Sequence, residues 1–406
     1  MIGTSNLRSL ATVRLRCNEV LEAAVAGNLH NFRVDLDKLD DVTEFIVSLI
    51  VRDYGSCSRE QIEETIKKIP SHGRLRHFGQ ANVDKLLSKL EGDKAKAILD
   101  LVMVAVLLDA GAGDKWTYCD HQDQDKIYSR SEGLGVAALR MFEQGLFSQE
   151  STNALRVDAE KLLQLTEDDL IKGMQISSSN PMVGLAGRTR LLNQLGKVLQ
   201  SGSKYFPGTE KRPSNLLNYL LECEESNVVD LQHLVDVIIE GLNDIWPKSR
   251  TAINGKFLGD VWPLSSLGGI HVPFHKLSQW LIYSLLEPLE GLAGLKFTNK
   301  ELLTGLAEYR NGGLFIDMGV IVPLTLTSGQ KYSVSDCVIV EWRAMTVALI
   351  DLLSVKMRKR LGVSAEQLPL GKLLEAGTWK AGREVAKSKR PSGEPPIQIE
   401  SDGTLF

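Results

Sequence analysis

The sequence predicts a mainly α-helical, multi-helix globular protein with a small β-hairpin or short sheet in its C-terminal half. Apolar residues recur at the helical spacing of three and four over most of the chain, as in Val42, Phe45, Ile46 and Leu49. Strand-like alternation is weak and is confined to 314–326 and 332–340. The composition, 43% apolar and 24% charged over 406 residues, is typical of a chain that buries a sizeable core without disulfides or metals.

The predicted helices share an apolar period near 3.6 and recognisable start or stop residues. They cover residues 11–26, 40–51, 94–109, 132–142, 158–165, 167–173, 187–200, 230–242, 275–289 and 342–361. The segment 94–109 is apolar nearly all round, so we expect its helix to run through the core. The two strand-like segments are expected to pair around Thr327–Lys331, where a Ser-Gly pair favours a turn.

The domain organisation is predicted from a change of composition at residues 201–214, which read SGSKYFPGTEKRPS. This segment indicates a loop between an N-terminal helical part, 1–200, and a C-terminal helical part, 215–406, that carries the candidate site. We expect the two parts to pack as one compact module. The sequence contains no internal repeat and no low-complexity tract.

Charge and hydropathy exclude several classes of partner. The formal charge of −4, from 47 basic and 51 acidic residues, gives no case for nucleic acid or an anionic membrane. One basic cluster near the C-terminus fits a solvated helix end; it contains Lys380, Arg383, Lys387, Lys389 and Arg390. The longest apolar stretch, Leu101–Leu108, is far shorter than the roughly 20 residues that a membrane span needs. No nucleic-acid or membrane partner is therefore expected, and the sequence does not specify an oligomeric state.

The cysteines indicate a reducing compartment. Five cysteines are scattered along the chain without a CxxC pair, so neither a disulfide framework nor a cysteine-zinc site is predicted. The N-terminal segment is amphipathic and lacks the apolar core of a signal peptide. Arg8, Arg14 and Arg16 are compatible with a mitochondrial presequence, but Glu19 and Glu22 follow in the same helical pattern. We therefore predict a cytoplasmic protein.

General catalytic signatures are absent from the sequence. It contains no GxGxxG after a strand, no phosphate-binding GxxxxGK[ST] loop, no HExxH and no GxSxG. His271 and His275 have the spacing of paired metal ligands on a helix, but Pro273 lies between them and disfavours a regular helix there. No metal site and no cofactor are predicted.

Three polar clusters occur where the pattern predicts burial. The first follows the core helix and contains Asp109 and Asp114 among glycines; a plain helix end with a turn is an equal alternative. The second contains His275 and Gln279, which share one helix face, with a structural hydrogen bond as the commoner role of a lone histidine. The second cluster also includes the tryptophans at positions 262 and 280.

The third cluster, Glu308-Tyr309-Arg310, precedes a double glycine. An acid, an aromatic ring and a base on an adaptable backbone suit a pocket wall, although a surface loop with an ion pair is the alternative. Further along the chain, Glu341 and Arg343 open the last long helix, where the positive end of the helix dipole favours an acid.

Long blocks in and around these clusters resemble the uracil-catabolism family of the fungal and bacterial URC/Urg gene clusters. They include LLDAGAGDKW, RSEGLGVAALRMFE, NPMVGLAGR, GDVWP, VPFHKLSQWLIYSLLEPLE, TGLAEYRNGGLFIDMGV, VEWRAMTVALIDLL, LEAGTWKAGRE and PPIQIESDGTLF. The resemblance runs over essentially the whole chain, from about Val13 to Phe406. It implies a role in degrading the pyrimidine ring at the nucleotide level, beside a uracil phosphoribosyltransferase, a GTP-cyclohydrolase-like protein and urea-degrading enzymes. It does not supply a catalytic residue list.

A fainter resemblance links the segments GLAEYRNGGLFIDMGVI and VEWRAMTVALIDLL to the closing half of the queuosine-salvage N-glycosylases. By this likeness Glu308 takes the place of a catalytic aspartate. Tyr309-Arg310 and Glu341-x-Arg343-Ala344 match residue for residue. The departure is the extra methylene of Glu308, and the likeness covers about a tenth of the chain.

The resemblances together predict an N-ribosyl hydrolase that acts on a ribosyl-urea or a pyrimidine-nucleotide-derived intermediate. Such a bond breaks through an oxocarbenium-like state, which a nearby carboxylate stabilises. The expected catalytic groups are Glu308, Asp109 as a second acid, with Asp114 as an alternative, and His275 as proton donor. The residues expected to bind substrate are Tyr309, Arg310, Arg343, Glu341, Asp114, Trp262, Gln279 and Trp280. This hypothesis assumes that the carboxylates near positions 109, 308 and 341 line one sheltered hollow.

Other functions remain possible on the sequence alone. The leading alternative is a non-catalytic protein that binds a pyrimidine nucleotide or regulates the same pathway. An amidohydrolase would need a metal or a nucleophile, which the sequence does not offer clearly. A nucleic-acid glycosylase is disfavoured by the acidic charge balance.

Overall fold

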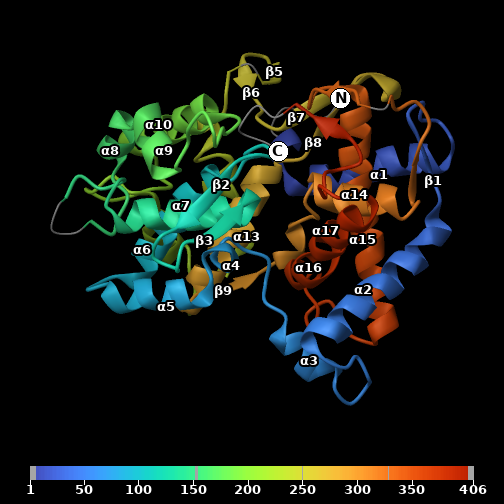
Figure 1. Ribbon diagram of the computed structural model, residues 1–406, viewed down its shortest axis with the longest axis horizontal. Helices are drawn as coiled ribbons and strands as arrows, with labels where there is room; N and C mark the ends of the chain where they lie inside the picture. Colours follow the sequence, from blue (N-terminus) through green and yellow to red (C-terminus); the bar gives the residue numbers. More distant parts are fainter. Residues whose placement is uncertain (1–5, 151–153, 249, 328, 401–406) are drawn as a thin grey trace. The chain divides into compact units, whose positions relative to one another are not determined.

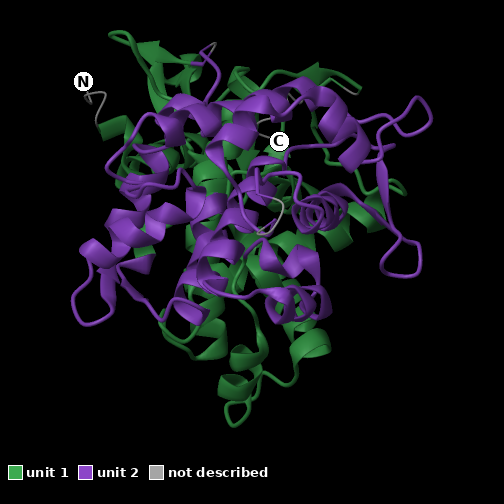
Figure 2. Ribbon diagram, turned by 90° about the vertical axis from the view of Figure 1, so that its left-hand side faces the viewer, with its two compact units in different colours: residues 1–72, 251–279, 301–400 green, residues 73–250, 280–300, 401–406 purple. Residues whose placement is uncertain are grey.

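The computed structural model describes residues 6–150, 154–248, 250–327 and 329–400, and it divides the chain into two compact units (Figure 2). Each unit is built from segments that are distant in sequence. The described part of unit 1 comprises residues 6–72, 251–279, 301–327 and 329–400, and that of unit 2 comprises 73–150, 154–248, 250 and 280–300. The division predicted from the sequence lies at 201–214, whereas the unit boundaries follow His72, Arg250, Gln279 and Lys300.

Unit 1 is assembled around its longest helix, α15 (Cys337–Leu361), which is buried on all sides over most of its first half. Helices α1, α2 and α14 pack against α15, and α17 packs against α14. Its other helices and its strands, labelled in Figure 1, are α1 (Leu10–Val25), α2 (Leu39–Tyr54), α3 (Ile62–Lys68), α14 (Tyr309–Asp317), α16 (Leu370–Leu373), α17 (Trp379–Lys389), β1 (Phe32–Val34), β5 (Ala252–Ile253), β6 (Lys256–Phe257), β7 (Val261–Leu264), β8 (Ile270–Pro273), β10 (Ile321–Pro323), β11 (Lys331–Tyr332) and β12 (Gln398–Ile399).

Unit 2 has the apolar helix α6 (Lys94–Leu107) in its core, with every residue from Ala97 to Leu107 buried. Helix α7 packs on α6, and α10 packs on α8. The remaining elements are α4 (Leu75–Phe78), α5 (Gln80–Lys89), α7 (Arg130–Glu143), α8 (Ala159–Gln164), α9 (Glu167–Gly173), α10 (Leu185–Gln200), α11 (Leu216–Glu222), α12 (Leu231–Ile239), β2 (Thr117–Asp120), β3 (Lys126–Ser129), β4 (Val228–Asp230) and β9 (Lys296–Thr298). Helix α13 (Lys276–Gly291) contains the unit boundary after Gln279.

The mainly α-helical prediction is confirmed, and most predicted helices are found within a few residues of their expected ends. The helix predicted at 342–361 begins earlier, at Cys337, directly after Asp336 in the N-cap position. The β-structure of the described residues consists of two-stranded pairs only. Three are antiparallel hairpins, β2–β3, β5–β6 and β7–β8, and the last two lie in the C-terminal half as expected.

The hairpin predicted around Thr327–Lys331 is wrong. The first four residues of its predicted first strand, 314–317, are the end of helix α14, which Glu308 caps. The last four residues of its predicted second strand, 337–340, are the start of α15. The short strand that does form after α14, β10, pairs antiparallel with β1 from the N-terminal end of the chain. Strand β11 pairs in parallel with β12 near the C-terminal end. Pairing between segments about 290 residues apart leaves no local signal in the sequence.

A buried aspartate explains why the segment 201–214 is not a unit boundary. Asp100 lies in the middle of α6 with no exposed surface. Its carboxylate accepts hydrogen bonds from Nη2 of Arg212 at 2.7 Å and from the backbone N–H of Ser214 at 2.8 Å. A buried charge needs such partners, so this carboxylate fixes the end of the loop to the core helix of unit 2.

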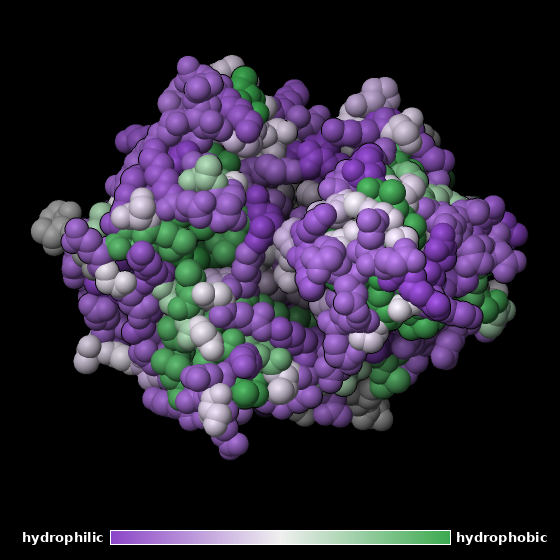
Figure 3. Space-filling model, turned by 90° about the horizontal axis from the view of Figure 1, so that it is seen from below, coloured by the Kyte–Doolittle hydropathy of each residue, from purple (hydrophilic) through white to green (hydrophobic). Residues whose placement is uncertain are grey.

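None of the helices in the described residues is long and apolar enough to cross a membrane. The view in Figure 3 shows a surface that is mostly hydrophilic, with patches of apolar residues between the hydrophilic ones.

Candidate functional site

Glu308 is the N-cap residue of α14. Its Oε2 accepts a hydrogen bond from the backbone N–H of Arg310 at 2.9 Å, and its Oε1 accepts one from Asn311 at 2.6 Å. Ser, Thr, Asp and Asn are the usual residues at this position, and the positive end of the helix dipole favours an anion there. Glu308 is only partly buried. Its carboxylate is therefore held in one orientation, while two of its roughly four lone-pair sites are not used by the cap.

Arg310 stacks on an aromatic ring of the neighbouring helix. Its guanidinium carbon lies 4.7 Å from the ring centre of Trp379, at the start of α17, and 5.7 Å from that of Tyr309. The guanidinium of Arg383, one turn along α17, lies 5.7 Å from the same Trp379 ring. Two cations on one indole form a cation–π arrangement.

A glycine makes this close approach of the two helices possible. A Cβ atom on Gly382 of α17 would overlap the backbone carbonyl of Arg310 in α14. On the other side of α14, a Cβ on Gly312 would meet the indole of Trp342 in α15 at 2.7 Å. The double glycine that the sequence analysis interpreted as an adaptable pocket wall thus lies inside a helix, and Gly312 allows that helix to pack closely.

A histidine–carboxylate pair lies beside Trp379. Nδ1 of His72 is 2.6 Å from Oε2 of Glu375, and the rings of His72 and Trp379 have centres 6.3 Å apart. His72 is 4% exposed. Glu375 lies in a π-helical turn, Leu374–Thr378, which leads directly into α17. Such turns occur often at functional sites.

We call these residues the Trp379 cluster: His72, Glu308, Tyr309, Arg310, Glu375, Trp379 and Arg383. All belong to unit 1. It combines two carboxylates, a carboxylate-bonded imidazole, two guanidinium groups and two aromatic rings. Glu308, Tyr309 and Arg310 were predicted as site residues from the sequence, and the other four were not. The block LEAGTWKAGRE was conspicuous, yet no periodicity indicates a π turn, and His72 stands in an unremarkable loop.

Arg343 lies elsewhere in unit 1, in a closed ion pair. Its Nη1 and Nη2 donate to the two carboxylate oxygens of Asp260, both at 2.8 Å, and its guanidinium stacks on Phe274 at 4.0 Å. Trp262 Nε1 donates to Asp260 at 2.8 Å, and the backbone N–H of Lys276 donates at 3.0 Å.

Burial of Asp260 acts to raise the pKa of its carboxyl. The charge of Arg343 and these hydrogen bonds outweigh burial and hold the pKa well below its usual range. Arg343 and Trp262 were predicted to bind substrate. In the structure the guanidinium of Arg343 and the indole N–H of Trp262 donate to the buried carboxylate of Asp260.

His275 and Gln279 hold the chain together around that pair. His275 is 5% exposed, and its Nε2 lies 2.8 Å from the backbone carbonyl oxygen of Leu7, so Nε2–H donates there. Gln279, 1% exposed, donates to the carbonyl of Phe274 at 3.0 Å and accepts from the backbone N–H of Thr304 at 2.9 Å. These contacts fix the start of α13 and the segment that leads to Glu308.

Glu341 is fully buried on α15. Its Oε2 accepts from Nδ2 of Asn31 at 3.0 Å, and its Oε1 lies 3.4 Å from Sγ of Cys337. Asn31 immediately precedes β1, so this contact ties the N-terminal strand to the long helix.

Asp109 belongs to unit 2. Its carboxylate accepts from Ser131 Oγ at 2.6 Å and from Trp280 Nε1 at 3.1 Å, and it forms an ion pair of 2.9 Å with Nη1 of Arg74. Arg74 has no exposed surface, and its Nε and Nη2 lack a hydrogen-bond partner among the described residues. This pair is the reason for a carboxylate at the C-terminal end of α6.

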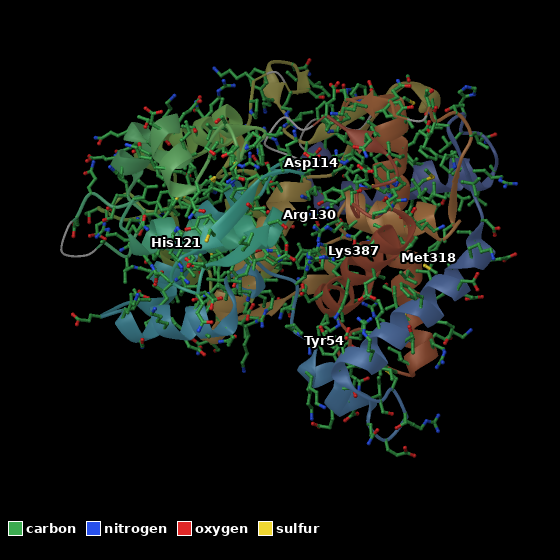
Figure 4. All side chains as sticks on the ribbon, viewed as in Figure 1. Tyr54, Asp114, His121, Arg130, Met318 and Lys387 are labelled. Carbon is green, nitrogen blue, oxygen red and sulfur yellow. The ribbon has the colours of Figure 1, made fainter. Side chains whose placement is uncertain are left out.

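Asp114, labelled in Figure 4 and also in unit 2, is exposed. Since Asp109 and Asp114 belong to one unit and Glu308 and Glu341 to the other, the single hollow assumed for these carboxylates stays a prediction.

The fold and the Trp379 cluster define a mainly helical protein with a carboxylate, aromatic and guanidinium site that has no general catalytic signature. The chain belongs to the family described as protein of unknown function (DUF1688), whose model matches residues 6–406. It is 40% identical to "Uracil catabolism protein 4" of Lachancea kluyveri over 449 residues, which cover 99% of this chain and 98% of the relative. It is 42% identical to "Protein urg3" of Schizosaccharomyces pombe over 419 residues, with the same coverage of 99% and 98%. The family resemblance noted in the sequence is thereby confirmed.

Proposed function

We propose that this protein works in uracil catabolism and hydrolyses the N-ribosyl bond of a ribosyl-urea or of a related intermediate derived from a pyrimidine nucleotide. The name of the Lachancea kluyveri relative supports the pathway. The observation that supports this reaction is the Trp379 cluster. In it the carboxylate of Glu308, which caps α14, lies two residues before Arg310, whose guanidinium stacks on the indole of Trp379.

The reaction adds water to C1 of the ribose and breaks the bond from C1 to nitrogen, whose electron pair leaves with the urea nitrogen. Positive charge develops on the ring oxygen and C1 as this bond lengthens. Glu308 stabilises that charge or orients the attacking water through the oxygen lone pairs that the helix cap does not use. The planar ureido group stacks on Tyr309 or Trp379, and the guanidinium groups of Arg310 and Arg383 suit a phosphate on the ribose.

The departing nitrogen needs a proton, and we now assign this role to His72 in place of His275. His275 Nε2 donates to a backbone carbonyl, which gives that ring a structural hydrogen bond. His72 instead donates from Nδ1 to the carboxylate of Glu375, a pairing that orients the imidazole. Arg343 and Glu341 serve in this proposal as supports of the fold around α15. Asp109 is not required by this mechanism.

The direct assay is release of urea from ribosyl-urea and from its 5′-phosphate by the purified protein. We expect Glu308→Gln to lower the rate by about 100-fold or more, the usual loss when one stabilising group is removed from a charged transition state. Glu308→Asp preserves a carboxylate and a good N-cap, so we expect partial activity. Glu301→Gln, at an exposed position of the same unit, is the matched control and should not change the rate. Absence of urea release by the wild-type protein would refute the proposal.

The role of His72 can be separated from that of Glu308 with an activated substrate. A 4-nitrophenyl riboside has a leaving group that departs without a proton. We expect His72→Asn to lose much more activity on ribosyl-urea than on this riboside, whereas Glu308→Gln loses activity on both. Equal losses for the two variants on both substrates would remove His72 from the role of proton donor.

A second candidate, binding of a pyrimidine nucleotide without turnover, is favoured by one observation. Both oxygens of Glu308 already bond backbone N–H groups, which is a complete structural role for this side chain. This candidate predicts tight binding of a pyrimidine nucleotide by calorimetry, no release of urea, and little effect of Glu308→Gln on affinity.

A further inference from the structure

The hairpin β2–β3 of unit 2 carries three different metal-binding side chains at its turn. Sγ of Cys119 lies 3.8 Å from Nδ1 of His121 and 4.0 Å from Oδ1 of Asp125, and the last two atoms are 2.7 Å apart. The three donor atoms thus lie within 4.8 Å of one another. His121 is labelled in Figure 4. Among the residues that the structure describes, these are the three histidine, cysteine or acidic side chains whose ligand atoms lie close enough together to hold one metal ion.

These separations suit a tetrahedral zinc ion. With metal–sulfur bonds near 2.3 Å and metal–nitrogen and metal–oxygen bonds near 2.0–2.1 Å, ligand atoms lie about 3.3–3.6 Å apart. Each of the three observed distances differs from that range by less than about 1 Å. His121 and Asp125 have side chains 73% exposed, so both can rotate by this amount without disturbing a packed core.

The backbone that carries the ligands is anchored on both sides. The side-chain amide of Gln175 accepts from the backbone N–H of Cys119 at 2.9 Å and donates to its carbonyl at 2.8 Å. The next residue, Asp120, is 1% exposed and forms a two-point ion pair with Arg140, at 2.9 and 2.7 Å. Across the turn, Tyr128 donates to Asp123 at 2.9 Å. A metal site needs such support to hold its ligands in place.

The donor set also selects among metals. One sulfur, one imidazole nitrogen and one carboxylate oxygen match zinc and its neighbours in the transition series. Calcium and magnesium prefer several oxygen ligands, and a single carboxylate with a thiolate is a poor match for either. Three protein ligands leave the fourth position for water, as in zinc sites that exchange ligands.

We propose that Cys119, His121 and Asp125 form a binding site for one zinc ion, with a water molecule as the fourth ligand. On binding, the thiol of Cys119 loses its proton to solvent and the thiolate bonds to the metal. The site lies outside the Trp379 cluster, and the proposed N-ribosyl hydrolysis does not depend on it. No metal site was predicted from the sequence, because it lacks a CxxC pair and Pro273 lies between His271 and His275. The signal that was not used is the spacing of two and four residues between Cys119, His121 and Asp125.

The test uses cobalt, which takes the same ligands as zinc and reports a thiolate bond by its charge-transfer absorption. The full-length protein, stripped with a chelator, is titrated with Co²⁺ and the bound cobalt is then displaced with Zn²⁺. We expect one equivalent of cobalt, an absorption band of the cobalt–thiolate bond, and its loss when zinc is added.

Three variants locate the site. Cys119→Ser should abolish the charge-transfer band, and His121→Ala and Asp125→Asn should each weaken binding. Cys57→Ser, at another partly exposed cysteine, is the matched control and should leave the titration unchanged. Circular dichroism of each variant shows whether it is folded. No band with the wild-type protein, or a band that survives in folded Cys119→Ser, would overturn the assignment.

Discussion

Two regions of unit 1 use arginine in different ways. At the Asp260 pair, Arg343 is 2% exposed, and each carboxylate oxygen of Asp260 accepts one of its N–H groups. In the Trp379 cluster, the guanidinium groups of Arg310 and Arg383 lie against the indole of Trp379. The carboxylate of Glu308 caps the start of α14, the helix that carries Arg310. The first arrangement is complete within the fold. The Trp379 cluster combines polar and charged groups with aromatic rings, and this combination is typical of a ligand-binding site. We therefore expect changes at the first region to affect mainly folding, and changes at the second to affect mainly activity.

The largest effect on stability is expected for Asp260→Asn. This change preserves the shape of the side chain but leaves the guanidinium of Arg343 buried without a charge partner, which costs about 3–5 kcal/mol of unfolding free energy. Chemical denaturation measures this loss. The control is Asp41→Asn, in an exposed ion pair of the same unit whose aspartate side chain is 61% exposed; we expect little change there. Equal stability of the two variants would contradict a structural role for the Asp260 pair.

The acid dependence of stability sharpens the same point. The pKa of Asp260 is lowered in the folded protein, so its contribution is fully present above the pKa of an unfolded aspartate, about 3.9. It is lost as the pH falls through the lower, folded value. The difference in unfolding free energy between wild type and Asp260→Asn should therefore be constant at neutral pH and shrink below about pH 4. Denaturation curves at a series of pH values test this, and a difference that grows in acid would be inconsistent with the lowered pKa.

A smaller loss of stability, with a larger loss of activity, is expected for Gly382→Ala. The added methyl group meets the carbonyl of Arg310 and pushes α17 away from α14, at a cost of about 1–3 kcal/mol for an overpacked contact. Because Arg310 and Trp379 lie on these two helices, urea release should fall in protein that is still folded. Gly291→Ala is the matched control, since nothing lies within 4 Å of its added methyl group. Full activity of Gly382→Ala would show that the spacing of α14 and α17 does not matter for function.

Much of the helical architecture could be predicted from the sequence, because the long helices carry a strong apolar period. The apolar helix 94–109 and the helix 342–361 are found nearly as expected, as α6 and α15. Two of the strand pairings could not be predicted, since β1 pairs with β10 and β11 with β12 across large distances in the chain. Periodicity also does not show which segments share a unit, and the segment 201–214 is held to α6 by Asp100.

The candidate site was predictable only in part, for a physical reason. Glu308-Tyr309-Arg310 are consecutive, so the sequence itself brings them together. His72, Glu375, Trp379 and Arg383 join them through packing between α14, α17 and a π turn, which a pattern of apolar residues does not encode. Conversely, a polar residue in the sequence of an apolar helix is predicted to be buried, but the sequence does not show which group it contacts. Arg343 and Glu341 were expected to face a substrate, and their partners in the fold are Asp260 and Asn31.

The measurement that tests the central claim most directly is the parallel appearance of both products from ribosyl-urea. Wild-type protein should release free ribose and urea in equal amounts and at the same rate, because one bond, from C1 to nitrogen, is broken. Both products should fall together by about 100-fold or more in Glu308→Gln. Ammonia without free ribose, or a rate that does not change in Glu308→Gln, would contradict cleavage of this bond by the Trp379 cluster.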